Sequence, residues 1–208
     1  MGWYPITLDL TGRRCVVIGG GAVAERKIEG LLAAGAAVTV VSPALTPRLA
    51  DLVHARRIAH THRAYQAGDL AGFALAFAAT GATDVNAAVA REGRRRGAWV
   101  NAADDPAHCN FILPSVLRRG ELTVAGSTGG TAPALARAVR ERIERQVGEE
   151  IAMLSEVAAD VRRELRARGH VADSAAWQRA LDAPLRRLAA RGHRGAARRR
   201  LLARLGAA

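Results

Sequence analysis

The chain has 208 residues, half of them apolar, which is long enough to bury a core without disulfides or a structural metal. Its two cysteines and six histidines show neither a disulfide framework nor the spacing of a metal site. No apolar stretch is long enough to cross a membrane and the first residues lack the features of a secretory signal, so we expect a cytoplasmic protein.

The net charge of +12 is concentrated after residue 161, where thirteen arginines face three acids. Arginines neutralise phosphates, so this segment could bind nucleic acid. They also grip carboxylates in bidentate pairs, so it could bind a polyanionic small molecule. The chain has thirty arginines but one lysine, Lys27, which indicates a compositional bias and leaves solvated helix faces as a third interpretation.

Apolar strands alternate with helical patterns through the first hundred residues. Strands are predicted at 14–19, 36–43, 57–63, 73–80 and 98–103. Helices are predicted at 24–35, at 46–55 with Thr46 as N-cap, and at 83–97. Because most of these strands are apolar on both faces, the pattern predicts an α/β fold, a Rossmann-like parallel sheet with helices on both faces.

The pattern changes after residue 110. Two strand-like segments joined by a turn at Arg119 and Gly120 are predicted within 111–128, and the remainder is helical. Helices are predicted at 131–148, with Thr131 as N-cap, at 149–168 and at 173–190, whereas 191–208 has no acids and is expected to fray. The predicted domains are 1–113, a dinucleotide-binding domain; 114–148, a central dimerisation segment; and 149–208, a C-terminal helical domain with a basic tail.

The central segment is predicted to form a dimer interface. The stretch from residue 111 to residue 147, which includes most of this segment, has more apolar residues than so small a region could bury by itself, among them Leu113, Leu122, Val124, Leu135 and Val139. We therefore expect them to pack across a two-fold axis.

The stretch VVIGGGAVAERK, residues 16–27, places three glycines between a strand and a helix. Gly19, Gly21 and Ala24 form the pattern G-x-G-x-x-A, in which the first glycine permits a tight turn and the second lets a pyrophosphate approach the backbone. Helix N-terminal amides then point at the phosphates. The alternative is a merely structural glycine turn. The predicted cofactor contacts in this loop are Gly19, Gly21, Ala22, Val23 and Ala24.

Further cofactor contacts are predicted where other strands end. Ser42 and Pro43 stand where an acid normally binds the ribose hydroxyls. Serine can still bond a hydroxyl and Arg48 could accept a 2′-phosphate, so the residues leave NAD and NADP open. Thr80 and Asn101 are expected to face the nicotinamide or its ribose, with ordinary strand caps as the alternative.

Six motifs occur in one order along the chain: GGGAVAERK (19–27), TVVSP (39–43), AAT (78–80), VNAADDP (100–106), FILPS (111–115) and STGGTAPALAR (127–137). In this order and spacing they resemble the dehydrogenase and ferrochelatase module of siroheme synthase, the precorrin-2 dehydrogenase family. The resemblance runs from residue 3 to about residue 190. It implies NAD-dependent oxidation of precorrin-2 to sirohydrochlorin, a homodimer and, in some relatives, insertion of ferrous iron, a substrate, to give siroheme.

Asp104 is the predicted catalytic base. It follows the last strand of the predicted sheet, at the edge where ligands of open α/β folds bind, and it matches the aspartate that the family uses in catalysis. The alternative is that Asp104, Asp105 and Pro106 form only a turn. His108 could relay a proton or contact iron on its way in, but a loop histidine in solvent is the favoured interpretation.

A second glycine-rich stretch, STGGT, runs into a helix N-terminus. Backbone amides there could receive a carboxylate of the tetrapyrrole, so Ser127, Thr128 and Gly129 are the predicted substrate contacts, with a plain capped turn as the alternative. Thr128 stands where some siroheme synthases carry serine.

Two other functions compete with the dehydrogenase. One is a non-catalytic NAD-sensing regulator that binds nucleic acid through the arginine-rich segment. That segment contains no recognisable nucleic-acid motif and only one aromatic residue, Trp177, which disfavours nucleic acid as a partner. The other, a gating module of a transporter, leaves three of the six motifs without a task.

Overall fold

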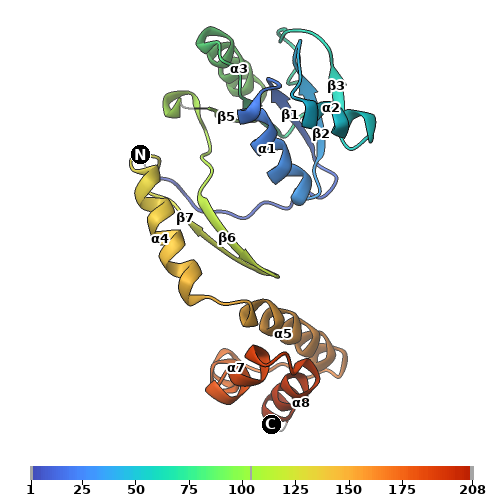
Figure 1. Ribbon diagram of the computed structural model, residues 1–208, viewed down its shortest axis with the longest axis vertical. Helices are drawn as coiled ribbons and strands as arrows, with labels where there is room; N and C mark the ends of the chain where they lie inside the picture. The colour runs from blue at the N-terminus through green and yellow to red at the C-terminus, as the bar shows by residue number, and fades with distance from the viewer. Residues whose placement is uncertain (1, 104, 207–208) are drawn as a thin grey trace. The chain divides into compact units, whose positions relative to one another are not determined.

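The computed structural model describes residues 2–103 and 105–206 and divides into two compact units at residues 112 and 113 (Figure 1). The division falls one residue before the predicted end of the dinucleotide-binding domain. The further boundary at residue 148 stays a prediction.

The first unit is built on a five-stranded parallel sheet. Its strands are β1 (Arg14–Ile18), β2 (Ala37–Val41), β3 (Ala59–Thr61), β4 (Leu75–Ala78) and β5 (Trp99–Ala102), in the order β3-β2-β1-β4-β5. All four residues of β4 are buried, as are the last four of β1, because the sheet is covered on both faces. The predicted Rossmann-like sheet is confirmed.

Helices cover both faces of this sheet. On one face α1 (Ala22–Ala33) and α2 (Pro47–His54) pack through Ile28 and Leu49, and on the other α3 (Thr83–Arg96) packs through Val89. Thr46 caps α2 as predicted, since its hydroxyl oxygen accepts a hydrogen bond from the Leu49 amide at 3.3 Å.

A buried carboxylate joins α3 to the loop that precedes β4. The side chain of Glu92 is 2% exposed and accepts hydrogen bonds from the Tyr65 hydroxyl at 2.6 Å and Arg96 Nε at 2.7 Å. It also accepts from the amides of Gly68 at 3.0 Å and Leu70 at 3.3 Å. Burial alone would raise the pKa of Glu92, but these donors outweigh it and the pKa is lowered. The charged side chain of Glu92 therefore fixes this loop to α3.

The second unit begins with an antiparallel hairpin and a helix. Strands β6 (Ser115–Arg119) and β7 (Leu122–Gly126) turn at Gly120, whose φ of 55° suits glycine, and α4 (Pro133–Gln146) packs against both strands. The predicted cap of this helix is wrong. Ala132 occupies the N-cap position, and its amide donates to the hydroxyl of Thr128 at 3.0 Å.

Four helices form the rest of the second unit. They are α5 (Glu150–Ala167), α6 (Ser174–Ala180), α7 (Ala183–Ala190) and α8 (Arg194–Leu205). The single helix predicted at 173–190 is wrong, because Asp182 interrupts it and caps α7 by accepting from the Leu185 amide at 2.9 Å. In the described part of the chain no helix is long and apolar enough to span a membrane.

The expectation that residues 191–208 fray is also wrong, since 194–205 form α8. Leu201 and Leu205 are buried in the core of the helical region. Arg194 pairs with Glu156 and with Asp160 of α5, and Arg200 pairs with Asp182. Acids that lie far away in the sequence thus supply the partners that the tail itself lacks, which favours the interpretation of its arginines as surface helix faces.

Candidate functional site

The glycine loop joins β1 to α1 at the carboxyl edge of the sheet. Gly19 has a φ of +119°, and a Cβ on it would overlap the carbonyl of Ala79. A Cβ on Gly20 would overlap the carbonyl of Ala44. The fold therefore requires glycine at both positions, and the loop lies between the ends of β2 and β4.

Gly21 differs from its two neighbours. It is the N-cap of α1, its φ of −90° is open to any residue, and a Cβ built on it meets nothing within 4 Å. The fold itself does not require glycine there. A phosphate that approaches the helix N-terminus does require it, so the residues present fit a dinucleotide pyrophosphate.

The first turn of α1 supplies the donors for such a group. The amides of Ala22, Val23 and Ala24 have no acceptor within the helix, because the first turn of any α-helix leaves its N–H groups unpaired. Ala24 is fully buried, and its small side chain keeps the helix close to the sheet. The site's electrostatic potential is favourable too, since a helix N-terminus carries partial positive charge.

The end of β2 lies beside this loop. Ser42 is 6% exposed and its hydroxyl donates to the carbonyl of Ala44 at 2.6 Å, while Pro43 is exposed. Arg48, the candidate 2′-phosphate partner, pairs with Glu29 of α1 and lies 3.9 Å from Glu25. Its charge is already engaged by acids.

Thr80 follows β4, and Asn101 lies within β5, the two strands on the other side of β1. The hydroxyl of Thr80 bonds to Asn86 Oδ1 at 2.8 Å, which ties the end of β4 to the start of α3. Asn101 is 7% exposed, accepts from Lys27 Nζ at 3.3 Å and donates to the Phe111 carbonyl at 3.1 Å. Both side chains have protein partners, and their cofactor roles stay predictions.

The loop after β5 contains a feature that the sequence analysis missed. Asp104, the predicted base, lies outside the described residues. Next to it, Asp105 Oδ2 lies 2.6 Å from His108 Nδ1, with the two side chains 25% and 32% exposed. His108 is therefore not a free loop histidine. The three-residue spacing across Pro106, which begins the short 3-10 helix η1 (Pro106–His108), was the available signal.

Cys109 anchors this loop to the sheet. Its sulfur accepts from the Ala102 amide at 3.2 Å, and its thiol is shared between the carbonyls of Ala102 at 3.2 Å and Asp105 at 3.3 Å. Burial raises the pKa of Cys109, so the group remains a thiol that can donate.

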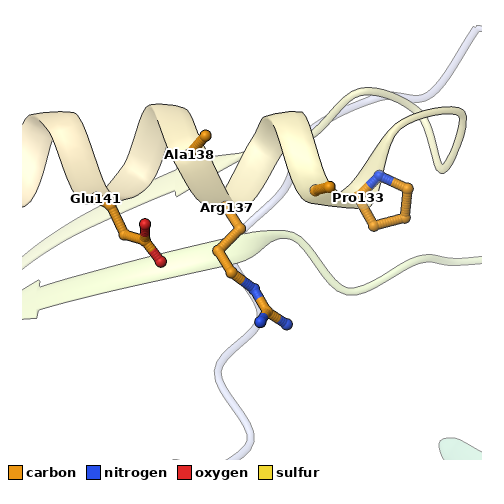
Figure 2. Close-up of a pocket in the computed structure, with 5 residues that line it drawn as sticks. Pro133, Arg137, Ala138 and Glu141 are labelled. Carbon is orange, nitrogen blue, oxygen red and sulfur yellow. The ribbon is translucent and has the colours of Figure 1, made fainter.

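The predicted substrate contacts lie in the second unit, where their side chains form a turn. Ser127 Oγ accepts from the Gly129 amide at 3.1 Å, and the Thr128 hydroxyl accepts from Ala132 as described above. The helix that follows carries a pocket lined by Pro133, Ala134, Arg137, Ala138 and Glu141. Figure 2 shows Arg137 and Glu141 at this pocket, one helical turn apart. A guanidinium so placed could pair with a carboxylate.

Metal-binding side chains do not gather within 2–103 and 105–206, where no three His, Cys, Asp or Glu residues form a potential ligand set. Two features lie at the carboxyl edge of this sheet. One is the glycine loop at the N-terminus of α1, which fits a dinucleotide pyrophosphate, and the other is the Asp105 and His108 pair after β5.

Comparisons with known proteins divide the chain in a similar way. A family model described as "Putative NAD(P)-binding" matches residues 6–115, and one described as "Sirohaem biosynthesis protein central" matches residues 119–146. Two curated relatives are siroheme synthases. That of Methylococcus capsulatus is 41% identical over 97% of this chain, and that of Chromobacterium violaceum is 38% identical over 100% of it.

These matches cover 43% and 44% of the two relatives, so the chain spans less than half of their length. A solved structure named "SirC, precorrin-2 dehydrogenase" is 25% identical, with a TM-score of 0.79 over 99% of this chain and 100% of its own. The likeness extends through both units.

Proposed function

This chain belongs to the family of the siroheme synthase N-terminal module, with its NAD(P)-binding domain, and from that premise we propose that it oxidises precorrin-2 to sirohydrochlorin. The observation that carries the proposal is Gly21. A Cβ at this position would meet no atom of the protein within 4 Å, so the fold itself does not require a bare backbone at this helix N-terminus. A dinucleotide pyrophosphate accounts for it.

The bound nicotinamide would supply the hydride acceptor for this oxidation. The chain's own residues perform the rest. The amides at the start of α1 would hold the pyrophosphate, and the close packing of Gly19 and Gly20 fixes the loop that presents them. Asp104, which follows β5 in the sequence, takes the proton that leaves the macrocycle when the hydride departs.

NAD rather than NADP is the proposed cofactor. A 2′-phosphate needs a cationic partner near the end of β2, and Arg48 is held there by Glu29 and Glu25. Reduction of NAD and NADP should be compared at equal concentrations with precorrin-2. Equal use of both would mean that Arg48 leaves its acids to bind the phosphate.

For the substrate, we propose contacts in the second unit. Precorrin-2 carries several carboxylates, and the turn at Ser127, Thr128 and Gly129 leads into α4, where Arg137 lines a pocket. Ferrous iron, where the chain inserts it, is a second substrate, and its entry would release pyrrole protons to the same base.

A homodimer is proposed from the exposed apolar residues within 111–147. Leu113, Leu135 and Val139 are 50%, 57% and 47% exposed, more than a lone subunit usually leaves on one small region. Sedimentation at micromolar concentration should give a dimer. A monomer under those conditions contradicts the assignment of this surface as a subunit interface.

The direct test of the function is turnover. The purified chain should be incubated without oxygen with precorrin-2 and NAD, while NADH formation and the macrocycle absorbance are followed together. Equal molar appearance of NADH and sirohydrochlorin supports the proposal. NAD binding without any NADH formation would leave a non-catalytic NAD-binding protein.

A further inference from the structure

We propose that His108, oriented by Asp105, is the group through which the proton from the macrocycle leaves for solvent. This inference rests on the proposed function and deepens it, because it assigns the step that follows proton removal. In each oxidation the macrocycle loses a hydride, which carries two electrons, and a proton, which a base receives. That proton must reach water before the base can act again.

The position of His108 suits the transfer of a proton to solvent. His108 ends the short helix η1, which begins four residues after the end of β5 at the carboxyl edge of the sheet, and Asp105 is the chain neighbour of the proposed base Asp104. His108 is 32% exposed, so it reaches solvent while remaining in contact with the protein. A group that moves a proton outward needs both conditions.

The hydrogen bond between Asp105 and His108 determines which ring nitrogen of His108 carries the hydrogen. A carboxylate can only accept, so the 2.6 Å contact between Asp105 Oδ2 and His108 Nδ1 places the ring hydrogen on Nδ1. Nε2 then keeps its lone pair, and no described residue is bonded to it. In the neutral ring Nε2 can accept the proton that the base releases, which gives an imidazolium beside the Asp105 carboxylate, and the imidazolium returns the proton to water.

The loop holds this pair in a fixed frame. The His108 amide donates to the Asp105 carbonyl at 3.1 Å, and the same carbonyl accepts from the thiol of Cys109. Asn110 ties the end of the loop to the sheet, since its Oδ1 accepts from the Val100 amide at 2.6 Å. The orientation of Asp105 therefore follows from backbone and thiol contacts as well as from the histidine.

The other histidines provide a contrast. His60 and His62 stack on each other at 5.4 Å, and His170 bonds to the carbonyl of Leu205. Within the described residues, His108 is the only histidine that pairs with a carboxylate. An imidazole oriented by a carboxylate is the arrangement that proton-transfer sites use.

The test uses the full chain and His108→Ala, with NADH formation measured in dilute and in concentrated buffer. In dilute buffer the rate should fall about 10-fold, less than the 10² to 10⁴-fold typical of a direct base, because the relay only carries the proton onward. Added imidazole should restore the rate, whereas the wild-type rate should not respond to it. NAD affinity and Tm should stay unchanged.

Two further variants complete the experiment. Asp105→Asn should also slow turnover in dilute buffer, because an amide can donate to Nδ1 and so place the ring hydrogen on Nε2. His54→Ala, at an exposed histidine in the last turn of α2, is the matched control and should behave as wild type.

The outcomes separate this inference from the proposed function. A wild-type chain that forms no NADH contradicts the function itself. An active wild type with an equally active His108→Ala overturns only the relay. A slow His108→Ala that neither imidazole nor buffer concentration accelerates also overturns it, because a purely structural role would give that result.

Discussion

The first unit and the C-terminal helices both have an apolar core, but they differ in whether polar side chains are buried in it. The four polar or charged side chains found buried among the described residues, Ser42, Asn86, Glu92 and Asn101, all lie in the first unit. The helical region of α5 to α8 has a core of leucine, valine and alanine, and its charges pair on the surface. Buried polar groups cost free energy unless they form hydrogen bonds. They therefore indicate the part of the molecule in which side-chain positions are most tightly constrained.

This difference predicts which substitutions impair function without unfolding the protein. In the first unit, changes at the carboxyl edge of the sheet that introduce no steric overlap should affect binding or chemistry while Tm holds. In the helical region, changes to the core should lower Tm while NAD binding holds. Four substitutions test this division.

The largest effect is expected at the glycine loop. Gly21→Val should abolish NAD binding, and activity with it, because the side chain would occupy the space of the pyrophosphate. Stability should fall by only about 1 kcal/mol, the cost of replacing glycine by valine at a helix N-cap. Calorimetric titration with NAD and thermal unfolding measure the two quantities. Gly20→Val is the contrast and should destabilise the fold, since its Cβ meets the Ala44 carbonyl.

Next comes the proposed base. Asp104→Ala should lower the dehydrogenation rate by about 10² to 10⁴-fold at unchanged NAD affinity, the range that a single general base contributes. In concentrated buffer Asp105→Ala should do much less, since buffer replaces the relay. If Asp104→Ala forms NADH at the wild-type rate, another residue must be the base.

A core substitution in the helices tests the other half of the comparison. Leu201 of α8 is fully buried, and Leu201→Ala should cost about 2 to 5 kcal/mol through the cavity that it leaves. Denaturant unfolding gives the stability, and NAD affinity should not change. Loss of NAD binding at a temperature where the variant is folded would show that the two regions are coupled.

The smallest effect is expected at Glu92. Glu92→Gln should cost about 1 to 3 kcal/mol at neutral pH, because the amide cannot satisfy all the donors that the carboxylate accepts. The pKa of Glu92 is lowered in the folded state, so its stabilisation is complete above the ordinary glutamate pKa of about 4.3 and is lost as pH falls through the lower folded value. The variant should therefore lose less stability than the wild type upon acidification. Parallel acid unfolding curves would contradict this.

The sequence predicted the sheet and its helices well because the signals there are local. Apolar runs mark buried strands, and the glycine pattern between a strand and a helix has one well-understood use. The signal at Asp182 was also local. An aspartate followed two residues later by Pro184 is a typical helix start, yet the apolar periodicity of 173–190 outweighed it in the prediction.

The errors at the C-terminus have a different physical origin. Nothing within 191–208 neutralises its arginines, and the acids that do so lie on α5 and before α7. Such pairs join residues more than fifteen positions apart, which a local pattern does not reveal. At the site, the sequence indicated Ser42, Thr80 and Asn101, but only the structure shows that the protein already uses their polar atoms.

The tight packing of Gly19 and Gly20 has a consequence for the thermodynamics of cofactor binding. Because neighbouring carbonyls confine both residues, the phosphate loop has lost its conformational entropy before any ligand arrives. Binding of the cofactor then orders little additional backbone. The binding free energy therefore retains almost all of the favourable contribution from the contacts with the diphosphate, because little is lost to loop ordering. ADP, which has the diphosphate but no nicotinamide, should accordingly retain a large part of the binding free energy of NAD.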